Sequence, residues 1–186
     1  MLKYIEEAGK YVEITGFRNI NVEDAEEFVK AARKELPECA WVQFFDAGLV
    51  ASWQHLYFAV LNALLAFKNG RNTSKSVVME AMLYASTQRQ IRKAIDFMGV
   101  KCAVADVAVV VIGKNAETVE ELLSAISKYL SKKTDDTVLE ISEKKAETIR
   151  EAFRITEAEL KAVLERNDAA LVDLVIERVA LLSTQL

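Results

Sequence analysis

The run of residues 103–112, AVADVAVVVI, restricts the fold more than any other stretch of this chain. Valine and isoleucine favour extended backbone, so the run predicts a strand over Ala103–Ile112 in the middle of a sheet. Asp106 interrupts the apolar pattern. Because an unpaired buried carboxylate is costly, we expect Asp106 at an edge or bonded to a backbone donor.

Residues that break helices and strands are scarce in the rest of the chain. Pro37 is the only proline among 186 residues, and there are six glycines, which predicts long elements joined by short connections. Further strands are predicted over Lys10–Phe17 and Cys39–Phe45, with a short edge strand over Thr137–Ile141. We expect one α+β (mixed α/β) domain over residues 1–186, with a small three- to four-stranded sheet packed with about seven helices.

Amphipathic spacing and capping residues predict where the helices begin and end. The expected helices run from Asn21 to about Leu36, Ser52–Asn69, Lys75 to about Ala85, Thr87–Gly99, Ala116–Leu130, Ser142–Phe153, Thr156–Asn167 and Asp168 to about Ser183. Thr87 with Gln90, and Thr156 with Glu159, fit capping boxes. The helix Ser52–Asn69 is apolar nearly all round, as expected of a helix surrounded by protein.

The stretch Tyr84–Gly99, YASTQRQIRKAIDFMG, separates two kinds of side chain. Helical spacing predicts an apolar stripe formed by Ile91, Ala94, Ile95 and Met98. Another face carries Arg89, Arg92, Lys93 and Asp96. A basic surface at a helix start is a candidate site for an anion or a phosphate, although helix starts are common.

Charge is distributed unevenly along the chain. The net charge is −4, which argues against a protein that coats nucleic acid indiscriminately. Between Lys68 and Lys101, seven Lys and Arg residues stand against Glu80 and Asp96, a local charge of +5 that leaves −9 for the remainder. Such a basic region can steer a polyanion to one place; the alternative is a set of solvated surface charges.

The last predicted helix carries two apolar stripes. One stripe consists of Leu171, Leu174, Val175 and Leu182, and the other of Val172, Ile176, Val179 and Ala180. One stripe can pack on the domain while the other meets another protein, because broad exposed apolar patches mark interfaces. Burial of both stripes in the same domain is the alternative.

The motifs of the common enzyme and metal classes are missing from the sequence. His55 is the only histidine, Cys39 and Cys102 form no CxxC pair, and no phosphate-binding glycine motif or nucleophile elbow occurs. A Ser86–His55 nucleophile pair can be drawn, but nothing supplies an orienting acid at a recognisable spacing. We therefore expect no enzyme activity, no cofactor and no metal.

Other features indicate the cellular setting. The two cysteines lie in apolar runs and are expected to be buried thiols in a reduced cytoplasm. The N-terminus lacks the apolar region of a signal peptide, and the apolar run Leu56–Phe67 is too short to span a bilayer. These features predict a soluble cytoplasmic protein without a membrane partner.

Several motifs resemble the smallest regulatory subunit of the KEOPS complex, the TPRKB-like family. They are Asp46-Ala47, His55-Leu56, Phe67-Lys68-Asn69-Gly70, the segment YASTQRQI at Tyr84–Ile91 with Ala94-Ile95 and Gly99-Val100, and the tail Glu177–Leu182. The resemblance covers nearly the whole chain, and YASTQRQI is its most specific part. Thr87 stands where the family often has glycine.

The resemblance implies a mixed α/β domain without catalytic activity of its own. It implies binding to the small kinase-like ATPase subunit of KEOPS and stimulation of that subunit during formation of threonylcarbamoyladenosine on tRNA. It also implies capture of tRNA through the single-stranded 3′ end. A protein-interaction adaptor that does not bind RNA, and a small-molecule enzyme built around His55 and Ser86, are the competing hypotheses.

The basic region and the last helix supply the candidate contact residues for these roles. We assign RNA binding to Lys68, Arg71, Lys75, Arg89, Arg92 and Lys93. We assign the kinase interface to Val172, Val175, Ile176, Val179 and Leu182, some of which must be core. Tyr57 or Tyr84 could stack a base, although both lie in apolar segments. Whether the isolated protein forms a homodimer stays open.

Overall fold

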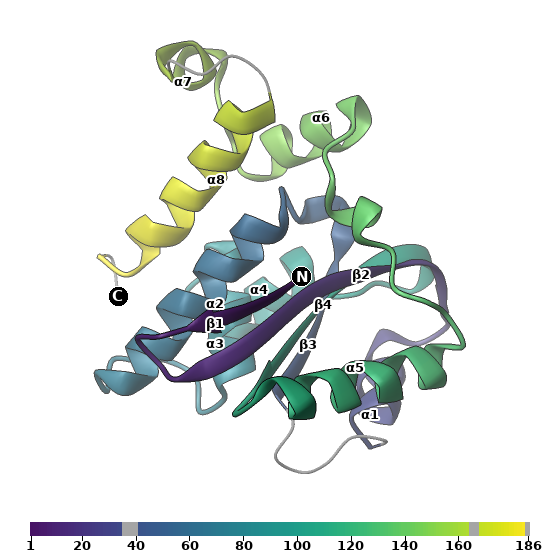
Figure 1. The fold of residues 1–186 in the computed structure, drawn as a ribbon. Coiled ribbons are helices and arrows are strands. Elements are labelled where there is room, and N and C mark those ends of the chain that lie inside the picture. Colours follow the sequence, from purple (N-terminus) through teal and green to yellow (C-terminus); the bar gives the residue numbers. More distant parts are fainter. Residues whose placement is uncertain (35–40, 164–167, 185–186) are drawn as a thin grey trace.

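The computed structural model describes residues 1–34, 41–163 and 168–184, and a four-stranded antiparallel sheet lies at its centre (Figure 1). The strands are β1 (Leu2–Ile5), β2 (Lys10–Val22), β3 (Trp41–Asp46) and β4 (Ala103–Gly113), in the spatial order β1-β2-β4-β3. The strand predicted over Ala103–Ile112 therefore lies inside the sheet, as expected. Asp106 accepts the backbone N–H of Asn19 at 2.9 Å, which is one of the two arrangements expected for its carboxylate.

Eight α-helices and two short 3₁₀ helices complete the described part of the chain. They are α1 (Ala25–Lys34), η1 (Ala47–Leu49), α2 (Trp53–Lys68), α3 (Val77–Ser86), α4 (Ile91–Met98), α5 (Ala116–Leu130), η2 (Asp136–Leu139), α6 (Glu143–Ala152), α7 (Glu157–Ala162) and α8 (Asp168–Leu182). The α+β class predicted from the sequence is confirmed. The side chains of Ser52, Asn115 and Ser142 cap α2, α5 and α6, and the Thr156–Glu159 capping box opens α7.

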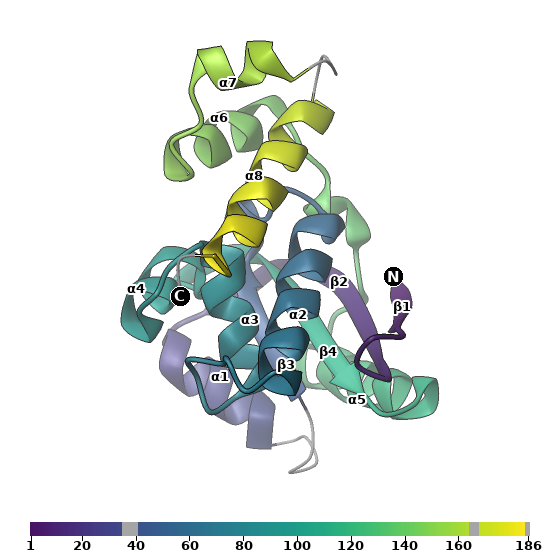
Figure 2. The ribbon, with the colours of Figure 1, turned by 90° about the vertical axis from the view of Figure 1, so that its left-hand side faces the viewer.

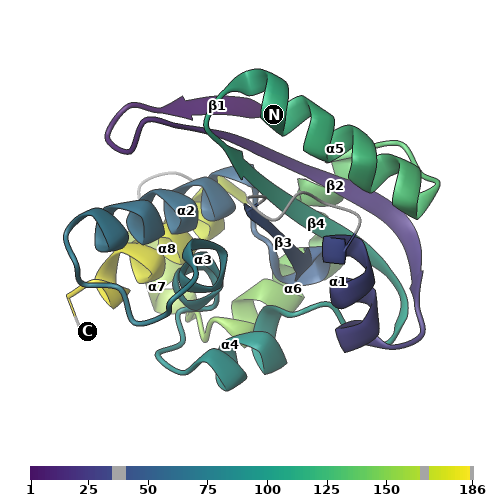
Figure 3. The same ribbon diagram turned by 90° about the horizontal axis from the view of Figure 1, so that it is seen from below.

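Alternate side chains of β4 enter two different cores. Val107, Val109 and Val111 pack in a core with residues of α1 and α5, whereas Ala108, Val110 and Ile112 pack in a core with residues of α2 and α3. Successive side chains of a strand point to opposite faces of the sheet, so both faces of β4 are covered by helices. Figure 3 shows α2 and α3 on one side of the sheet and α5 on the other.

The helices α6 and α7 lie beyond one end of the sheet, and α8 runs from them back along α2 (Figure 2). Arg178 of α8 joins them: its Nε donates to the Phe153 carbonyl at 3.1 Å, and its Nη2 lies 2.7 Å from Glu159 Oε1. This carboxylate also accepts hydrogen bonds from Thr156, and the combined contacts lower the pKa of Glu159 to about 2.

One expectation near the start of the chain was wrong. Asn21 does not cap a helix, because β2 continues through Val22 and pairs Asn21 with Val104. Asp24 caps α1 instead, and its Oδ1 accepts the N–H of Glu27 at 2.8 Å. The predicted end of this helix at Leu36, Pro37 and the start of the next strand at Cys39 lie outside the described residues, as does the helix end predicted at Asn167.

Cys102 was expected to be buried, and the structure contradicts this. Its side chain is exposed, and it precedes β4 rather than lying inside the strand. Cys39 lies outside the described residues.

The edge strand predicted over Thr137–Ile141 was also wrong. The segment forms η2, and β1 takes the fourth position in the sheet. The backbone N–H of Asp135 donates to the Gly16 carbonyl at 2.8 Å, and Val138 fills the space that a side chain at Gly16 would need. Within the described ranges, no helix is both long and apolar enough to cross a membrane.

Candidate interaction surfaces

The turn between α3 and α4 differs from the predicted capping box. Thr87 has φ 54° and ψ 28°, the left-handed conformation, and ends α3. The N–H of Thr87 donates to the Tyr84 carbonyl, and the N–H of Gln88 donates to the Leu83 carbonyl, both at 3.1 Å. These two bonds form a Schellman motif, which closes a helix C-terminus. The prediction that Thr87 opens the next helix was therefore wrong, and α4 begins at Ile91 after Gln90.

The helix α4 presents both basic and apolar side chains to solvent. Arg92 and Lys93 are exposed, and Arg89 is exposed just before the helix. The predicted apolar stripe is only half buried: Ala94 and Met98 lie in the core, but Ile91 and Ile95 are 41% and 44% exposed. We define Arg89, Arg92 and Lys93 as the α4 basic face.

The other predicted RNA-binding residues lie away from the α4 basic face. Lys68 ends α2 and Lys75 precedes α3, whereas the α4 basic face follows the opposite end of α3. Ten residues at a rise of about 1.5 Å make α3 about 15 Å long. Arg71 lines a separate hollow with Tyr84, Ser183 and other residues at the end of α8. The six residues are all exposed, but they do not form one continuous region.

Neither tyrosine considered for base stacking presents a free ring. Tyr84 is 3% exposed, and burial raises the pKa of its phenol. Tyr57 is half-buried and packs edge-on against Trp53 and Phe58.

The last helix, α8, lies alongside α2 and runs in the same direction. Its first turns share a hollow with the start of α2, and the residues after its end share another hollow with the end of α2. Figure 2 shows the two helices side by side. The first predicted stripe of α8 is core, since Leu171, Leu174, Val175 and Leu182 are at most 6% exposed.

The predicted kinase-interface residues divide between core and surface. Val175, Val179 and Leu182 are buried in the core between α8 and the rest of the protein. Val172 and Ile176 are half-buried and lie one turn apart on α8, so they share one flank of the helix. Phe58, which sequence reasoning did not select, is 37% exposed on α2. Because α2 and α8 lie side by side, we refer to Phe58 of α2 and to Val172 and Ile176 of α8 together as the α2–α8 apolar strip.

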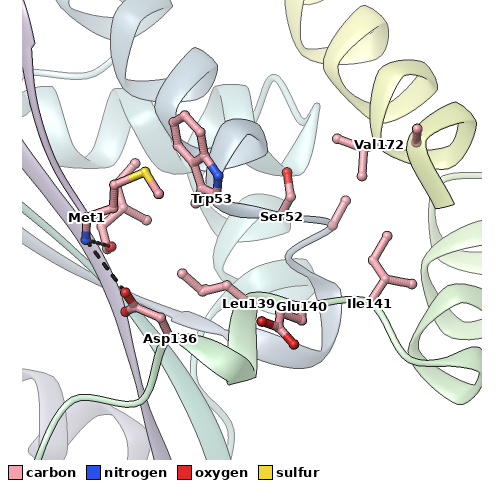
Figure 4. Close-up of a pocket in the computed structure, with 11 residues that line it drawn as sticks. Met1, Ser52, Trp53, Asp136, Leu139, Glu140, Ile141 and Val172 are labelled. Carbon is pink, nitrogen blue, oxygen red and sulfur yellow. Dashed lines mark hydrogen bonds and ion pairs between the residues drawn. The ribbon is translucent and has the colours of Figure 1, made fainter.

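A hollow of about 470 Å³ opens at the Val172 end of this strip (Figure 4). Its apolar wall comes from the starts of α2 and α8, from η2 and from the segment after η2, and includes Trp53, Leu139 and Ile141. The carboxylates of Asp136 and Glu140 are exposed and also line it. Nothing in the sequence pattern signals this hollow, because Trp53 and Ile141 are separated by 88 positions and meet only in the fold.

The arrangement around His55 excludes the nucleophile pair that could be drawn from the sequence. His55 is fully buried; its Nδ1 accepts the N–H of Ala51 at 3.2 Å, and its Nε2 lies 2.9 Å from the Ala85 carbonyl oxygen. Ser86 Oγ donates instead to the Met82 carbonyl at 2.7 Å. Desolvation lowers the pKa of His55 to about 4, so the ring is neutral near pH 7. Both side chains are therefore buried and bonded to backbone groups rather than to each other.

Comparison with known proteins identifies the family of this chain. The model of a family described as "Kinase binding protein CGI-121" matches residues 17–183. The chain belongs to the CGI-121 family. A relative named Regulatory protein Cgi121, from Methanocaldococcus jannaschii, is 34% identical over 140 residues, which cover 75% of this chain and 81% of the relative.

These matches confirm the resemblance that the motif at Tyr84–Ile91 indicated. They place the chain in a family of kinase-binding regulatory proteins, and both descriptions concern binding and regulation rather than an enzyme activity. The α2–α8 apolar strip is a surface through which a protein partner could be bound, and the α4 basic face is one through which a polyanion could be bound.

Proposed function

We propose that this protein is a non-catalytic subunit of a KEOPS-type complex that binds two partners through separate surfaces. One partner is the small kinase-like ATPase subunit, which it stimulates. The other is tRNA, which it recruits by the single-stranded 3′ end for threonylcarbamoyladenosine formation. The observation that carries the proposal is membership of the kinase-binding family together with an apolar strip that α8 leaves partly uncovered.

We assign kinase binding to the α2–α8 apolar strip and the adjoining hollow. Burying Phe58, Val172 and Ile176 against a partner removes apolar surface from water, the main favourable term in most protein association. Asp136 and Glu140 line the hollow, and Asp173 and Glu177 are exposed on α8. The partner should therefore present apolar side chains bordered by Lys or Arg.

We assign the main tRNA contact to the α4 basic face. Arg92 and Lys93 can contact phosphates, while the exposed side chains of Ile91 and Ile95 offer apolar contact to unstacked bases or riboses. The chain has a net charge of −4, so a local basic face directs RNA to one side of the protein. An adaptor without RNA binding is the alternative.

A reciprocal pair of double variants tests both assignments in one experiment. Val172→Glu/Ile176→Glu should weaken binding of the partner kinase at least tenfold, because it places carboxylates in an apolar contact, and should leave tRNA affinity within twofold. Arg92→Glu/Lys93→Glu should weaken tRNA binding at least tenfold and reduce its salt dependence, while kinase binding and ATPase stimulation persist. Calorimetry and a gel-shift assay measure the two affinities.

Leu181→Glu is the matched control for the kinase arm. Leu181 is 45% exposed on the same helix, about 140° around the axis from Ile176, so its substitution should not affect the kinase complex. Retention of kinase binding by the Val172/Ile176 variant would contradict the kinase assignment. Kinase binding with no tRNA binding by the wild-type protein would establish the adaptor alternative instead.

A further inference from the structure

A second hollow lies away from both proposed surfaces, where the turn between β1 and β2 meets the end of α2. It has a volume of about 780 Å³, and Figure 1 shows this turn beside the C-terminal end of α2. Among the described residues, its lining includes Lys10, Trp41, Phe67, Lys68 and Lys75. The start of β3 supplies Trp41 and the segment before α3 supplies Lys75, so four parts of the chain form this site.

The charge of this hollow is mainly positive. Three of its lining residues are lysines and one is a carboxylate, that of Glu7. Lys68 Nζ donates to the backbone carbonyl of Glu7 at 2.8 Å, and Lys10 Nζ lies 4.9 Å from the centre of the Trp41 ring. A carbonyl and an aromatic ring carry no formal negative charge, so these two contacts position the ammonium groups without neutralising them.

A smaller hollow continues this site along the end of the sheet. It has a volume of about 170 Å³, shares Lys10 and Trp41 with the larger hollow, and adds Lys114 and Asn115 at the start of α5. The Asn115 side chain accepts the N–H of Thr118, which leaves the first backbone N–H groups of a 15-residue helix directed outward. We define Lys10, Trp41, Lys68, Lys75 and Lys114 as the lysine–tryptophan groove.

The side chains of the groove match the repeating chemistry of a single nucleic-acid strand. Ammonium groups act as point charges for phosphates. The half-buried Trp41 indole packs against the core and carries the Lys10 ammonium over its ring, so a base stacks on it by taking the place of that ammonium. The four cations are all lysine. Lysine pairs with phosphates and with carboxylates alike, so the charges alone do not distinguish a nucleic acid from an acidic peptide. The aromatic ring favours a strand of nucleotides, because bases stack on such a ring.

We propose that the lysine–tryptophan groove binds a short single-stranded segment of RNA, with a base against Trp41 and successive phosphates along Lys75, Lys68, Lys10 and Lys114. The inference rests on the proposed RNA-recruiting function and adds a contact site at the opposite end of α3 from the α4 basic face. An RNA that occupies both sites would run along α3. The length of this helix separates the two sites by about 15 Å or more.

Tryptophan fluorescence tests the groove directly, because the chain has only two tryptophans. In a Trp53→Phe background the signal comes from Trp41. Titration with a single-stranded RNA octamer should quench it saturably, and raising the salt concentration should weaken binding. Lys68→Glu/Lys75→Glu should weaken octamer and tRNA binding at least fivefold, and the salt slope should fall by about 1.4 because two phosphate contacts are lost.

Lys128→Glu/Lys132→Glu is the matched control, since both lysines are exposed at the far end of α5. Its affinities should stay within twofold of wild type. Lys68→Gln/Lys75→Gln, which adds no negative charge, should give a smaller loss in the same direction. Both groove lysines are exposed, so circular dichroism should show a folded protein in each case.

The outcomes separate this inference from the proposed function. If the Lys68/Lys75 variants bind tRNA like wild type and Trp41 is not quenched, while Arg92→Glu/Lys93→Glu loses tRNA, the groove assignment is wrong and RNA recruitment stands. If wild-type protein binds neither tRNA nor the octamer, both proposals fail. If free ATP or AMP quenches Trp41 as strongly as the octamer does at equal phosphate concentration, the site takes mononucleotides and the strand assignment is overturned.

Discussion

Two backbone groups hold the imidazole of His55 in a single tautomer. Nδ1 accepts the N–H of Ala51, so Nε2 carries the proton and donates it to the Ala85 carbonyl. The ring also packs edge-on against Phe153. His55 is therefore a core histidine whose two ring nitrogens both have a partner. The particular acceptor could not be predicted, because Ala85 is 30 residues away and reaches His55 only through the packing of α3 on α2.

The depressed pKa of His55 predicts a loss of stability in mild acid. The unfolded state takes up a proton near pH 6.5, whereas the folded state does so only near pH 4. Stability should therefore be unaffected by this group above pH 6.5 and should fall by about 2 kcal/mol between pH 6.5 and 5. Urea unfolding at pH 7.5 and 5.0 measures the difference.

Because His55 is the only histidine of the chain, a loss of stability in this pH range can be attributed to it. Its single Cε1 proton resonance should titrate below pH 5 in the folded protein. His55→Gln should start from a lower stability and show little further decline between pH 7.5 and 5.0. A decline as large as that of wild type would show that another group is responsible.

At the scale of single elements, Thr87 shows why a local motif can mislead. The spacing Thr-x-x-Gln fits a helix start, but the same segment also ends the preceding helix. The N–H of Thr87 donates to the Tyr84 carbonyl of α3. The segment Thr137–Ile141 was misassigned for a related reason. Its β-branched residues favour a strand, but contacts with Gly16, 119 or more positions away, fold it as η2.

The left-handed backbone at Thr87 predicts a stabilising substitution. A β-branched residue with φ 54° is strained, whereas glycine adopts this conformation without a steric cost. Thr87→Gly should raise the free energy of unfolding by about 0.5–1 kcal/mol, which thermal unfolding would report as a rise in Tm of a few degrees. Thr87→Ala keeps a Cβ and should gain less.

Ser131 provides a second position at which the same prediction can be tested. It ends α5 with φ 52°, so Ser131→Gly should stabilise to a similar extent. Equal or lower stability of both glycine variants would mean that the backbone strain is offset by lost side-chain contacts.

At the scale of the whole molecule, the sequence predicted which elements lie in the core better than it predicted which exposed residues lie together. The continuous valine-rich run of β4 and the apolar character of α2 are enough to place both in the core. The division of the basic residues between two ends of α3 could not be predicted, because charge counted along the chain carries no direction in space. Likewise, two equivalent apolar stripes on α8 cannot show which one packs against α2.

The junction between η2 and the sheet fixes how the final third of the chain is attached. Asp135 binds the Gly16 carbonyl through its N–H, its carboxylate lies 2.9 Å from Arg18 Nε, and Val138 packs over Gly16. Hydrogen bonds from Thr137 and Arg18 lower the pKa of Asp135 to about 2, so this contact persists well into acid. The hollow beside Val172 depends on the junction, since Asp136 and Leu139 form part of its wall.

Gly16→Ala should therefore disturb both stability and kinase binding, although Gly16 lies outside the proposed interface. The added methyl group would collide with Val138, so η2 must shift, and the free energy of unfolding should fall by about 1–3 kcal/mol. Urea unfolding measures the loss, and hydrogen exchange should speed up across η2 first.

Val138→Ala removes the colliding methyl groups, so the Gly16→Ala/Val138→Ala double variant should be more stable than the sum of the two single changes predicts, by about 1 kcal/mol. Simple additivity would contradict the steric argument, because it would mean that residue 16 and Val138 do not compete for the same space.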